Sequence, residues 1–111
     1  MSRFRISDPA RDDLEHILSV SRERWGERGR ARYASLLALA FRQIARTPDG
    51  VGHDRSELAD GLRSLHIRQV RRANASVKDP AHVIFYRAGD VIEIVRVLHE
   101  RMDPTLHLVT R

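Results

Sequence analysis

A histidine, a glutamate and an arginine follow one another at the end of the last long apolar run of this chain. They are His99, Glu100 and Arg101, and Arg96 and Tyr86 lie upstream of them. Cleaving RNA takes a general base, a general acid and a cation that stabilises the charge developing on the phosphate. The residues that a ribonuclease could use here are therefore Arg96, His99, Arg101 and Tyr86.

Strand geometry argues against that chemistry. The apolar runs 82–87 and 91–98 are joined by a short Gly-Asp turn, a pattern typical of a β-hairpin. Successive residues of a strand point to opposite faces, so His99 and Glu100 should not share one pocket. The competing interpretation is that Glu100 and Arg101 form ion pairs that anchor the end of the sheet.

The first half of the chain predicts a short strand followed by two helices. Residues 3–7 alternate polar and apolar side chains, as in a half-buried strand. Asp8 is the expected N-cap of a first helix that ends at Gly26. A second helix is expected over residues 30–46, because apolar residues recur there every three to four positions. Pro48 stops it, and so short a link predicts an antiparallel helical hairpin.

The second half predicts strands. Residues 51–61 read as a loop, 62–70 as a strand and 71–80 as a long basic connection before the β-hairpin. The last strand is apolar on both faces, so either the C-terminal tail or a partner must cover its second face; we favour the partner. The expected fold is α+β: an N-terminal strand and a helical hairpin packed on a mainly antiparallel sheet. Expected core residues are Leu14, Ile17, Trp25, Tyr33, Leu37, Ile44, Phe85 and Ile94.

Composition narrows the classes of protein and site that fit. We expect residues 1–111 to form one domain. There is no cysteine, and no apolar run approaches the length of a signal core or membrane span, so we expect a soluble cytosolic protein. The six histidines lack metal-ligand spacing, and neither a metal nor a cofactor is predicted. The net charge is +5, with nine basic and five acidic residues after position 60, which suggests an anionic partner.

Several stretches together resemble a known family, the ParE branch of the RelE/ParE toxins from bacterial type II toxin–antitoxin systems. The matching residues are Asp13, Leu14, Ile17, Glu23-Arg24-Trp25-Gly26, Tyr33, Pro48, Gly61-Leu62-Arg63-Ser64, His82-Val83-Ile84-Phe85-Tyr86-Arg87 and the run from Ile92 to Asp103. They span nearly the whole chain in the family's order. One departure is the longer connection from Arg68 to Pro80.

The resemblance implies a toxin that inhibits DNA gyrase by binding it and is neutralised by a ParD-like antitoxin in a hetero-oligomer. Direct binding of nucleic acid is not expected. The RelE branch, which cleaves mRNA on the ribosome, is the first alternative, and a non-toxic antitoxin-binding module is the second. The residues that we expect to contact partners are Leu39, Arg42, Arg71, Arg72, Arg87, Arg96, His99, Glu100 and Arg101.

Overall fold

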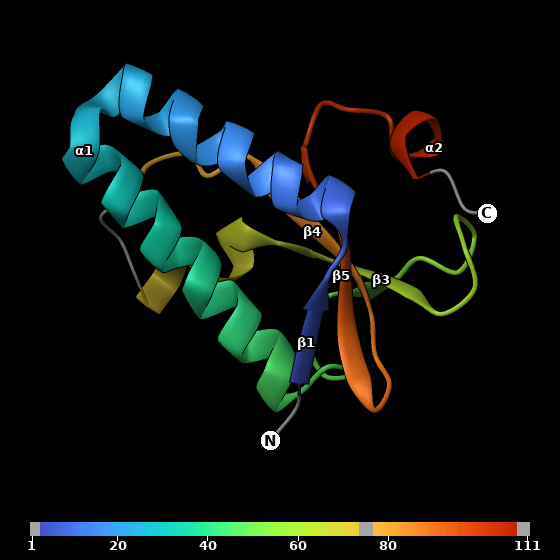
Figure 1. Ribbon diagram of the computed structural model, residues 1–111. Coiled ribbons are helices and arrows are strands. Elements are labelled where there is room, and N and C mark those ends of the chain that lie inside the picture. Colours follow the sequence, from blue (N-terminus) through green and yellow to red (C-terminus); the bar gives the residue numbers. More distant parts are fainter. Residues whose placement is uncertain (1–2, 74–76, 109–111) are drawn as a thin grey trace.

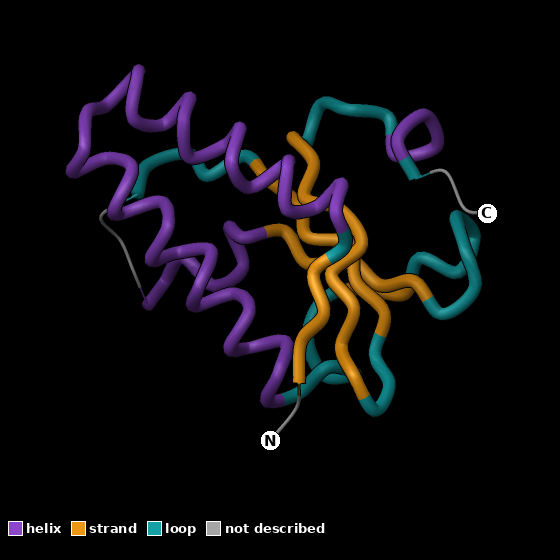
Figure 2. The backbone as a smooth tube through the Cα atoms, viewed as in Figure 1, coloured by secondary structure: helices purple, strands orange, loops and turns teal. Residues whose placement is uncertain are grey.

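The computed structural model describes residues 3–73 and 77–108, in which a helical hairpin packs on one face of a five-stranded mixed sheet (Figures 1 and 2). The elements, in chain order, are β1 Arg3–Ile6, α1 Asp8–Arg46, β2 His53–Asp54, β3 Leu62–His66, the 3₁₀ helix η1 Ile67–Ala73, β4 His82–Arg87, β5 Val91–His99 and α2 Pro104–His107. The strand order is β1-β5-β4-β3-β2, with β1 parallel to β5 and the other pairs antiparallel. The predicted α+β fold with a mainly antiparallel sheet is confirmed.

The N-cap of α1 is Ser7, not Asp8 as the sequence suggested. The Ser7 hydroxyl accepts a hydrogen bond from the backbone N–H of Ala10 at 3.1 Å and donates one to the carbonyl of Val95 at 2.7 Å. Ser7 therefore caps the helix and fastens its start to β5. Asp8 becomes the first helical residue, where its negative charge lies at the positive end of the helix dipole.

The helical hairpin is one run of helix broken at Gly26, as predicted. This residue has φ +73° and ψ −176°, a conformation that is essentially restricted to glycine. The second arm resumes directly after the break, earlier than the expected start at position 30, and ends at Arg46. Both arms contribute buried residues to the same core, including Ile17 from the first and Tyr33 and Leu36 from the second.

A β-bulge in the hairpin explains why β5 is apolar on both faces. Tyr86 pairs with Ile94, but Phe85 pairs with Arg96, so β5 carries one extra residue, Val95. The extra residue reverses the alternation of side chains. Ile92, Ile94 and Val97 pack beneath the helices, whereas Val95 and Leu98 belong to a second cluster on the other face.

The chain itself covers that second face, so the preference for a partner there was wrong. Leu62, Phe85 and Leu98 form a buried cluster, and Leu58, Ala59 and Leu108 pack against it. Phe85 and Leu98 are each only 2% exposed without any partner. The C-terminal tail and the loop before β3 therefore supply the cover.

Two further expectations were wrong in detail. The strand predicted over residues 62–70 ends at His66, because the backbone N–H of Arg68 donates to the His66 Nδ1 at 3.0 Å and the chain turns into η1. Trp25, expected in the core, is 58% exposed. It lies at the end of the first arm, just before the break at Gly26, and does not close the hairpin onto the core. The predicted loop 51–61 contains the short strand β2.

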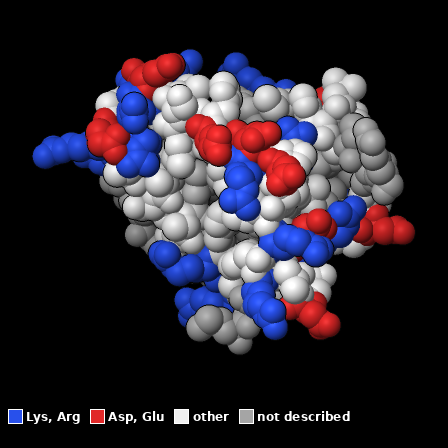
Figure 3. All heavy atoms as spheres, viewed as in Figure 1, with Lys and Arg blue, Asp and Glu red and all other residues white. Residues whose placement is uncertain are grey.

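Charged side chains of both signs share the surface. Figure 3 shows arginine and lysine interspersed with aspartate and glutamate over the face viewed in Figure 1. Five of the ion pairs among the described residues are Arg30–Glu27, Arg55–Glu57, Arg68–Glu100, Arg87–Glu93 and Arg96–Asp13. Within the described residues, no helix is long and apolar enough to cross a membrane.

Candidate functional site

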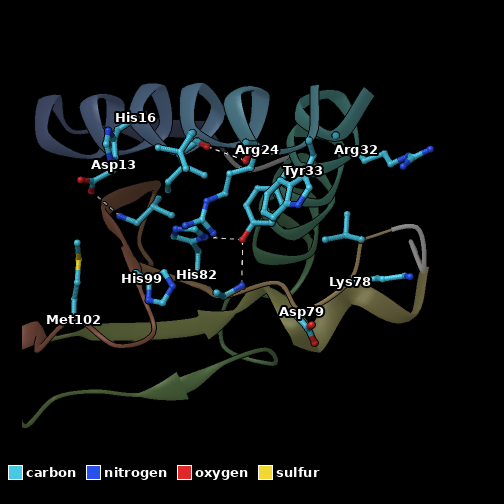
Figure 4. A pocket seen from close by; sticks show the side chains of 18 residues that line it. Asp13, His16, Arg24, Arg32, Tyr33, Lys78, Asp79, His82, His99 and Met102 are labelled. Carbon is cyan, nitrogen blue, oxygen red and sulfur yellow. Dashed lines mark hydrogen bonds between the residues drawn. The ribbon is translucent and has the colours of Figure 1, made fainter. Parts of the chain in front are cut away.

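The candidate site is a cavity of about 730 Å³ between the helical hairpin and the ends of β4 and β5. The first arm of α1 contributes residues from Asp13 to Trp25, and the second arm contributes Arg32 and Tyr33. The opposite wall is formed by residues 77–82 and by residues 97–102 of the last strand and its exit. Figure 4 shows the labelled side chains distributed along this space from Met102 at one end to Lys78 at the other.

Two histidines and a tyrosine meet inside the cavity. The Tyr33 hydroxyl accepts the backbone N–H of Ala81 at 3.2 Å and is hydrogen-bonded to the His82 Nδ1 at 2.6 Å. The rings of His82 and His99 lie edge to face, with centroids 5.4 Å apart. The bulge at Val95 makes this contact possible, because it shifts the register by one and places His99 opposite His82.

Burial sets the protonation states of this cluster. It lowers the pKa of His82 from 6.5 to about 4, and the neighbouring His99 adds to the effect. Burial also raises the pKa of Tyr33. At neutral pH both groups are therefore uncharged. As a general base His82 would be weak, since its pKa lies well below neutrality.

Three cations line the cavity without a partner among the described side chains: Arg24, Arg32 and Lys78. No hydrogen bond or ion pair joins any of their side chains to another described residue. In Figure 4 the Arg24 side chain extends from α1 toward His82, while Arg32 and Lys78 lie at the far end of the cavity. Of the lining carboxylates, Asp13 is neutralised by Arg96, and Asp79 lies exposed near Lys78.

Arg96 fastens three parts of the fold together and is not free to act on a substrate. Its Nε and Nη2 donate to the two carboxylate oxygens of Asp13 at 2.7 and 2.9 Å, and its Nη1 donates to the carbonyl of His107 at 2.8 Å. Asp13 also accepts the backbone N–H of Val97 at 2.9 Å. The ion pair raises the pKa of Arg96. Arg96, which we expected to contact a partner, therefore joins α1, β5 and the tail.

The residues singled out for ribonuclease chemistry do not form one site. Tyr86 is fully buried, and its hydroxyl is hydrogen-bonded to the carbonyls of Pro48 and Val51. His99 faces the cavity, but Arg101 is exposed and only its backbone N–H contacts the His99 Nδ1, at 3.1 Å. Together with the constrained Arg96, this arrangement separates the base, the cation and the tyrosine.

His99 lines the cavity and Glu100, just past the end of β5, does not, so the two residues do not share one pocket, as predicted. Glu100 accepts hydrogen bonds from His66 and Arg68, each at 2.7 Å, and the His66 contact is the main reason that its pKa is lowered. The interpretation of Glu100 as an anchor at the sheet end is confirmed. Arg101, by contrast, has no ion pair with another described residue, so that half of the interpretation is wrong.

The other expected partner residues are scattered. Arg87 bonds the carbonyl of Asp60 at 3.1 Å and approaches Glu93, which makes it part of the sheet's own structure. Leu39 is partly buried, and Arg42 is exposed on the second arm of α1. The side chains of Arg71 and Arg72 lie outside the described part of the chain. Of the seven residues whose side chains the structure describes, only His99 lines the cavity.

Comparison with known proteins identifies the family of this chain. A family model of the ParE toxin of the type II toxin–antitoxin system, parDE, matches residues 4–104. Toxin ParE1 of Caulobacter vibrioides is 38% identical over 108 residues, covering 97% of this chain and 99% of that protein. Toxin ParE1 of Mycobacterium tuberculosis is 33% identical over 104 residues, covering 92% and 93%. The chain belongs to the ParE toxin family.

A solved structure shows the same fold. It is described as a chromosomal ParDE TA system from P. aeruginosa, and its chain superimposes with a TM-score of 0.66, covering 89% of this chain and 96% of that one. The sequences are 16% identical, so this likeness concerns the fold alone. The resemblance to the ParE toxins is thereby confirmed, and the protein is a toxin-family component of a type II toxin–antitoxin system.

Sequence reasoning missed most of the cavity of this ParE-family chain. Its polar lining includes Arg24, Arg32, Lys78 and His82, none of which was singled out as a site residue. A signal was present for Arg24, because it continues the 3–4 spacing of Asp13, Ile17 and Val20 along the inner face of α1. For His82 no local signal existed, since its pairing with His99 depends on the bulge. Within the described residues, no group of three or more His, Cys, Asp or Glu could hold a metal.

Proposed function

We propose that this ParE-family toxin inhibits DNA gyrase by protein–protein binding in the cytoplasm and is neutralised by a ParD-like antitoxin. The observation that carries the proposal is the family match over residues 4–104, supported by relatives named Toxin ParE1 that align along nearly their full length.

The geometry supports binding over turnover. Tyr86 is enclosed at 0% exposure, and the guanidinium of Arg96 is occupied by Asp13. A phosphoryl-transfer site would need such groups free and directed at one point. We therefore assign the protein no enzymatic activity, and inhibition should require at least one toxin molecule for each gyrase it blocks.

A ribosome-dependent ribonuclease is the second candidate, and one observation favours it. The imidazoles of His82 and His99 face a cavity that also holds the unpaired Arg24. Against it, the Nδ1 of His82 is occupied by Tyr33 and the pKa of His82 is about 4. If this candidate were correct, His99→Ala would abolish mRNA cleavage in growing cells while leaving the protein folded.

The deciding experiment follows cells after induced expression and assays purified gyrase in parallel. Our proposal predicts growth arrest, loss of supercoiling by gyrase and mRNA that stays intact in its early phase. Rapid loss of mRNA with unimpaired gyrase would establish the ribonuclease instead. Normal growth at high expression would identify a non-toxic antitoxin-binding module.

A further inference from the structure

We infer that the open edge of β1 binds an acidic, extended segment of the toxin's target, which joins the sheet as an additional strand. The inference rests on the proposed function, because it names the surface by which the toxin recognises that target. We call this surface the β1 edge; it consists of Arg3, Phe4 and Arg5 of β1 and Phe41, Arg42 and Arg46 near the end of α1.

The backbone of β1 is unpaired on its outer side. β1 is the outermost strand of the sheet, and within the described residues it pairs only with β5. The Ser7 N–H donates to the carbonyl of Ile94 in β5 at 3.1 Å. Because successive N–H groups along a strand point to opposite edges, those of Phe4 and Ile6 point outward. An extended segment can therefore pair with this edge.

Phe4 and Phe41 provide exposed apolar surface along the edge. Phe4 is 38% exposed, and its ring lies beside that of Phe41 with the centroids 5.9 Å apart. Aromatic side chains that become buried supply much of the binding energy at many protein interfaces. An apolar residue of an added strand beside Phe4 would bury the part of this ring that is now exposed.

Four arginines surround these rings without an ion-pair partner among the described residues. Arg3 and Arg5 flank Phe4, while Arg42 and Arg46 lie one helical turn apart on α1, and all four arginines are exposed. Arginine and lysine predominate at the lower end of the molecule in Figure 3, where Figure 1 places β1 and the end of α1. The β1 edge therefore favours a partner that brings negative charge.

The acids of this region leave the positive charge in excess. Glu93, which lies opposite Arg5 on β5, is ion-paired with Arg87 at 3.5 Å. Asp49 and Asp90 are exposed in the turns after α1 and before β5, so two carboxylates stand against four arginines. A segment with two or more carboxylates would bring the charge of the β1 edge toward balance.

The order Arg-Phe-Arg defines the pattern that a partner strand must have. Side chains of a strand alternate between the two faces of a sheet, so Arg3 and Arg5 share one face and Phe4 takes the other. Neighbouring strands place side chains of the same face beside one another, and opposite charges there are stabilising. The matching segment therefore carries carboxylates at alternate positions with an apolar residue between them.

The same pattern disfavours two other occupants. A second copy of β1 paired antiparallel about Phe4 would set Arg3 beside Arg5 of the other copy, and like charges at such positions are destabilising. A nucleic acid has no backbone amides with which to extend the sheet, and its affinity depends on many phosphate contacts. An acidic protein segment uses both the open backbone and the charge.

The β1 edge is separate from the cavity. None of its residues lines the cavity, and its neighbours on β5 are Val91 to Glu93, whereas the cavity includes His99 at the other end of that strand. A strand rises about 3.3 Å per residue, which places Val91 and His99 roughly 25 Å apart. Substitutions at the β1 edge should therefore leave the cavity unchanged.

The test measures binding of purified gyrase to immobilised toxin by surface plasmon resonance, with inhibition of supercoiling followed in parallel. Wild type is compared with Arg5→Glu, Arg42→Glu and their double variant. Arg28→Glu is the matched control, because Arg28 is an exposed arginine of α1 that lies near the break at Gly26 and outside both the β1 edge and the cavity. Thermal melting confirms that each variant folds, as expected for exposed side chains.

We expect Arg5→Glu and Arg42→Glu each to weaken gyrase binding at least about tenfold, and the double variant to weaken it further, with Arg28→Glu unchanged. Affinity for the cognate ParD-like antitoxin, measured by titration calorimetry, should be the same for all these proteins. Equal gyrase affinity of wild type and edge variants would overturn the inference while leaving the proposed function intact. Wild type that neither binds nor inhibits gyrase would remove the proposed function and the inference with it.

Two further results would also overturn the inference. Edge variants that lose antitoxin affinity together with gyrase affinity would assign the β1 edge to the antitoxin. Hydrogen exchange of the wild-type toxin tests the added strand itself, because the outward N–H groups of Phe4 and Ile6 should exchange more slowly in the gyrase complex. Unchanged exchange of β1 in that complex would show that no strand is added.

Discussion

At the scale of single residues, His82 couples the fold to pH. The pKa of His82 is about 4 in the folded protein and near 6.5 in the unfolded chain. Between these two pH values the unfolded chain binds a proton at His82 and the folded chain does not. The contribution of His82 to the free energy of unfolding is therefore present above about pH 6.5 and is lost as the pH falls toward 4.

We predict that protonation of His82 in the unfolded chain lowers the free energy of unfolding by about 2 to 3 kcal/mol between pH 7 and pH 4.5. In His82→Asn the amide oxygen can still accept from Tyr33, but the side chain no longer titrates. Urea unfolding at several pH values should show a flatter dependence for His82→Asn than for wild type. Parallel curves for the two proteins would show that another group controls the acid response.

A second prediction about a single residue concerns Asp13, which binds the Arg96 guanidinium and the Val97 N–H. Asp13→Ala would leave the Arg96 guanidinium without its carboxylate and the Val97 N–H without its acceptor. We expect the variant to lose about 2 to 4 kcal/mol of unfolding free energy, the cost of stranding a partly buried charge. Asp12→Ala is the control, because Asp12 is exposed and has no bond to Arg96. A similar loss of unfolding free energy in both variants, measured by chemical denaturation, would show that the Asp13–Arg96 ion pair does not stabilise the fold.

At the scale of elements, Gly26 decides the shape of α1. An alanine at this position would have to adopt φ +73°, although its Cβ would meet no atom within 4 Å. Backbone strain alone should therefore cost Gly26→Ala about 1 to 3 kcal/mol. Gly89→Ala, in the β4–β5 turn at an ordinary φ with its Cβ 3.5 Å from the nearest atom, should cost nothing comparable. Equal melting temperatures for these two variants would contradict this account of the hairpin.

The elements were predictable where their signals are local. Gly26 and Pro48 interrupt a clear helical periodicity, and the Gly-Asp turn separates two apolar runs, so the helical hairpin and the β-hairpin follow from the sequence. The bulge was not predictable, because the extra Val95 is apolar like its neighbours and alters only the pairing. That one residue decides which side chains of β5 face the helices and brings His99 to His82.

The site was harder to predict than the fold for the same reason. Trp25 continues the apolar stripe of the first arm, so the sequence predicts that it is buried. Only the structure shows that its side chain is exposed at the end of that arm. Arg96 looked like a free cation at the sheet end, yet its partner Asp13 lies 83 positions earlier in the chain. Contacts across such separations have no counterpart in local periodicity.

At the scale of the whole molecule, the proposed function is binding of a partner without turnover. The second face of the sheet is closed by the chain's own tail and the loop before β3, Arg96 of β5 is bound internally, and three cations without an ion pair to another described residue line one cavity. A toxin that inhibits by binding, as we propose, must be present in amounts comparable to those of its target.

The most direct measurement is therefore a titration of supercoiling by purified gyrase at fixed enzyme concentration with increasing purified toxin. The account predicts that supercoiling falls only as the toxin reaches at least one molecule per gyrase, and that added antitoxin restores it. Supercoiling that stays unimpaired at a large molar excess of folded toxin would contradict the account.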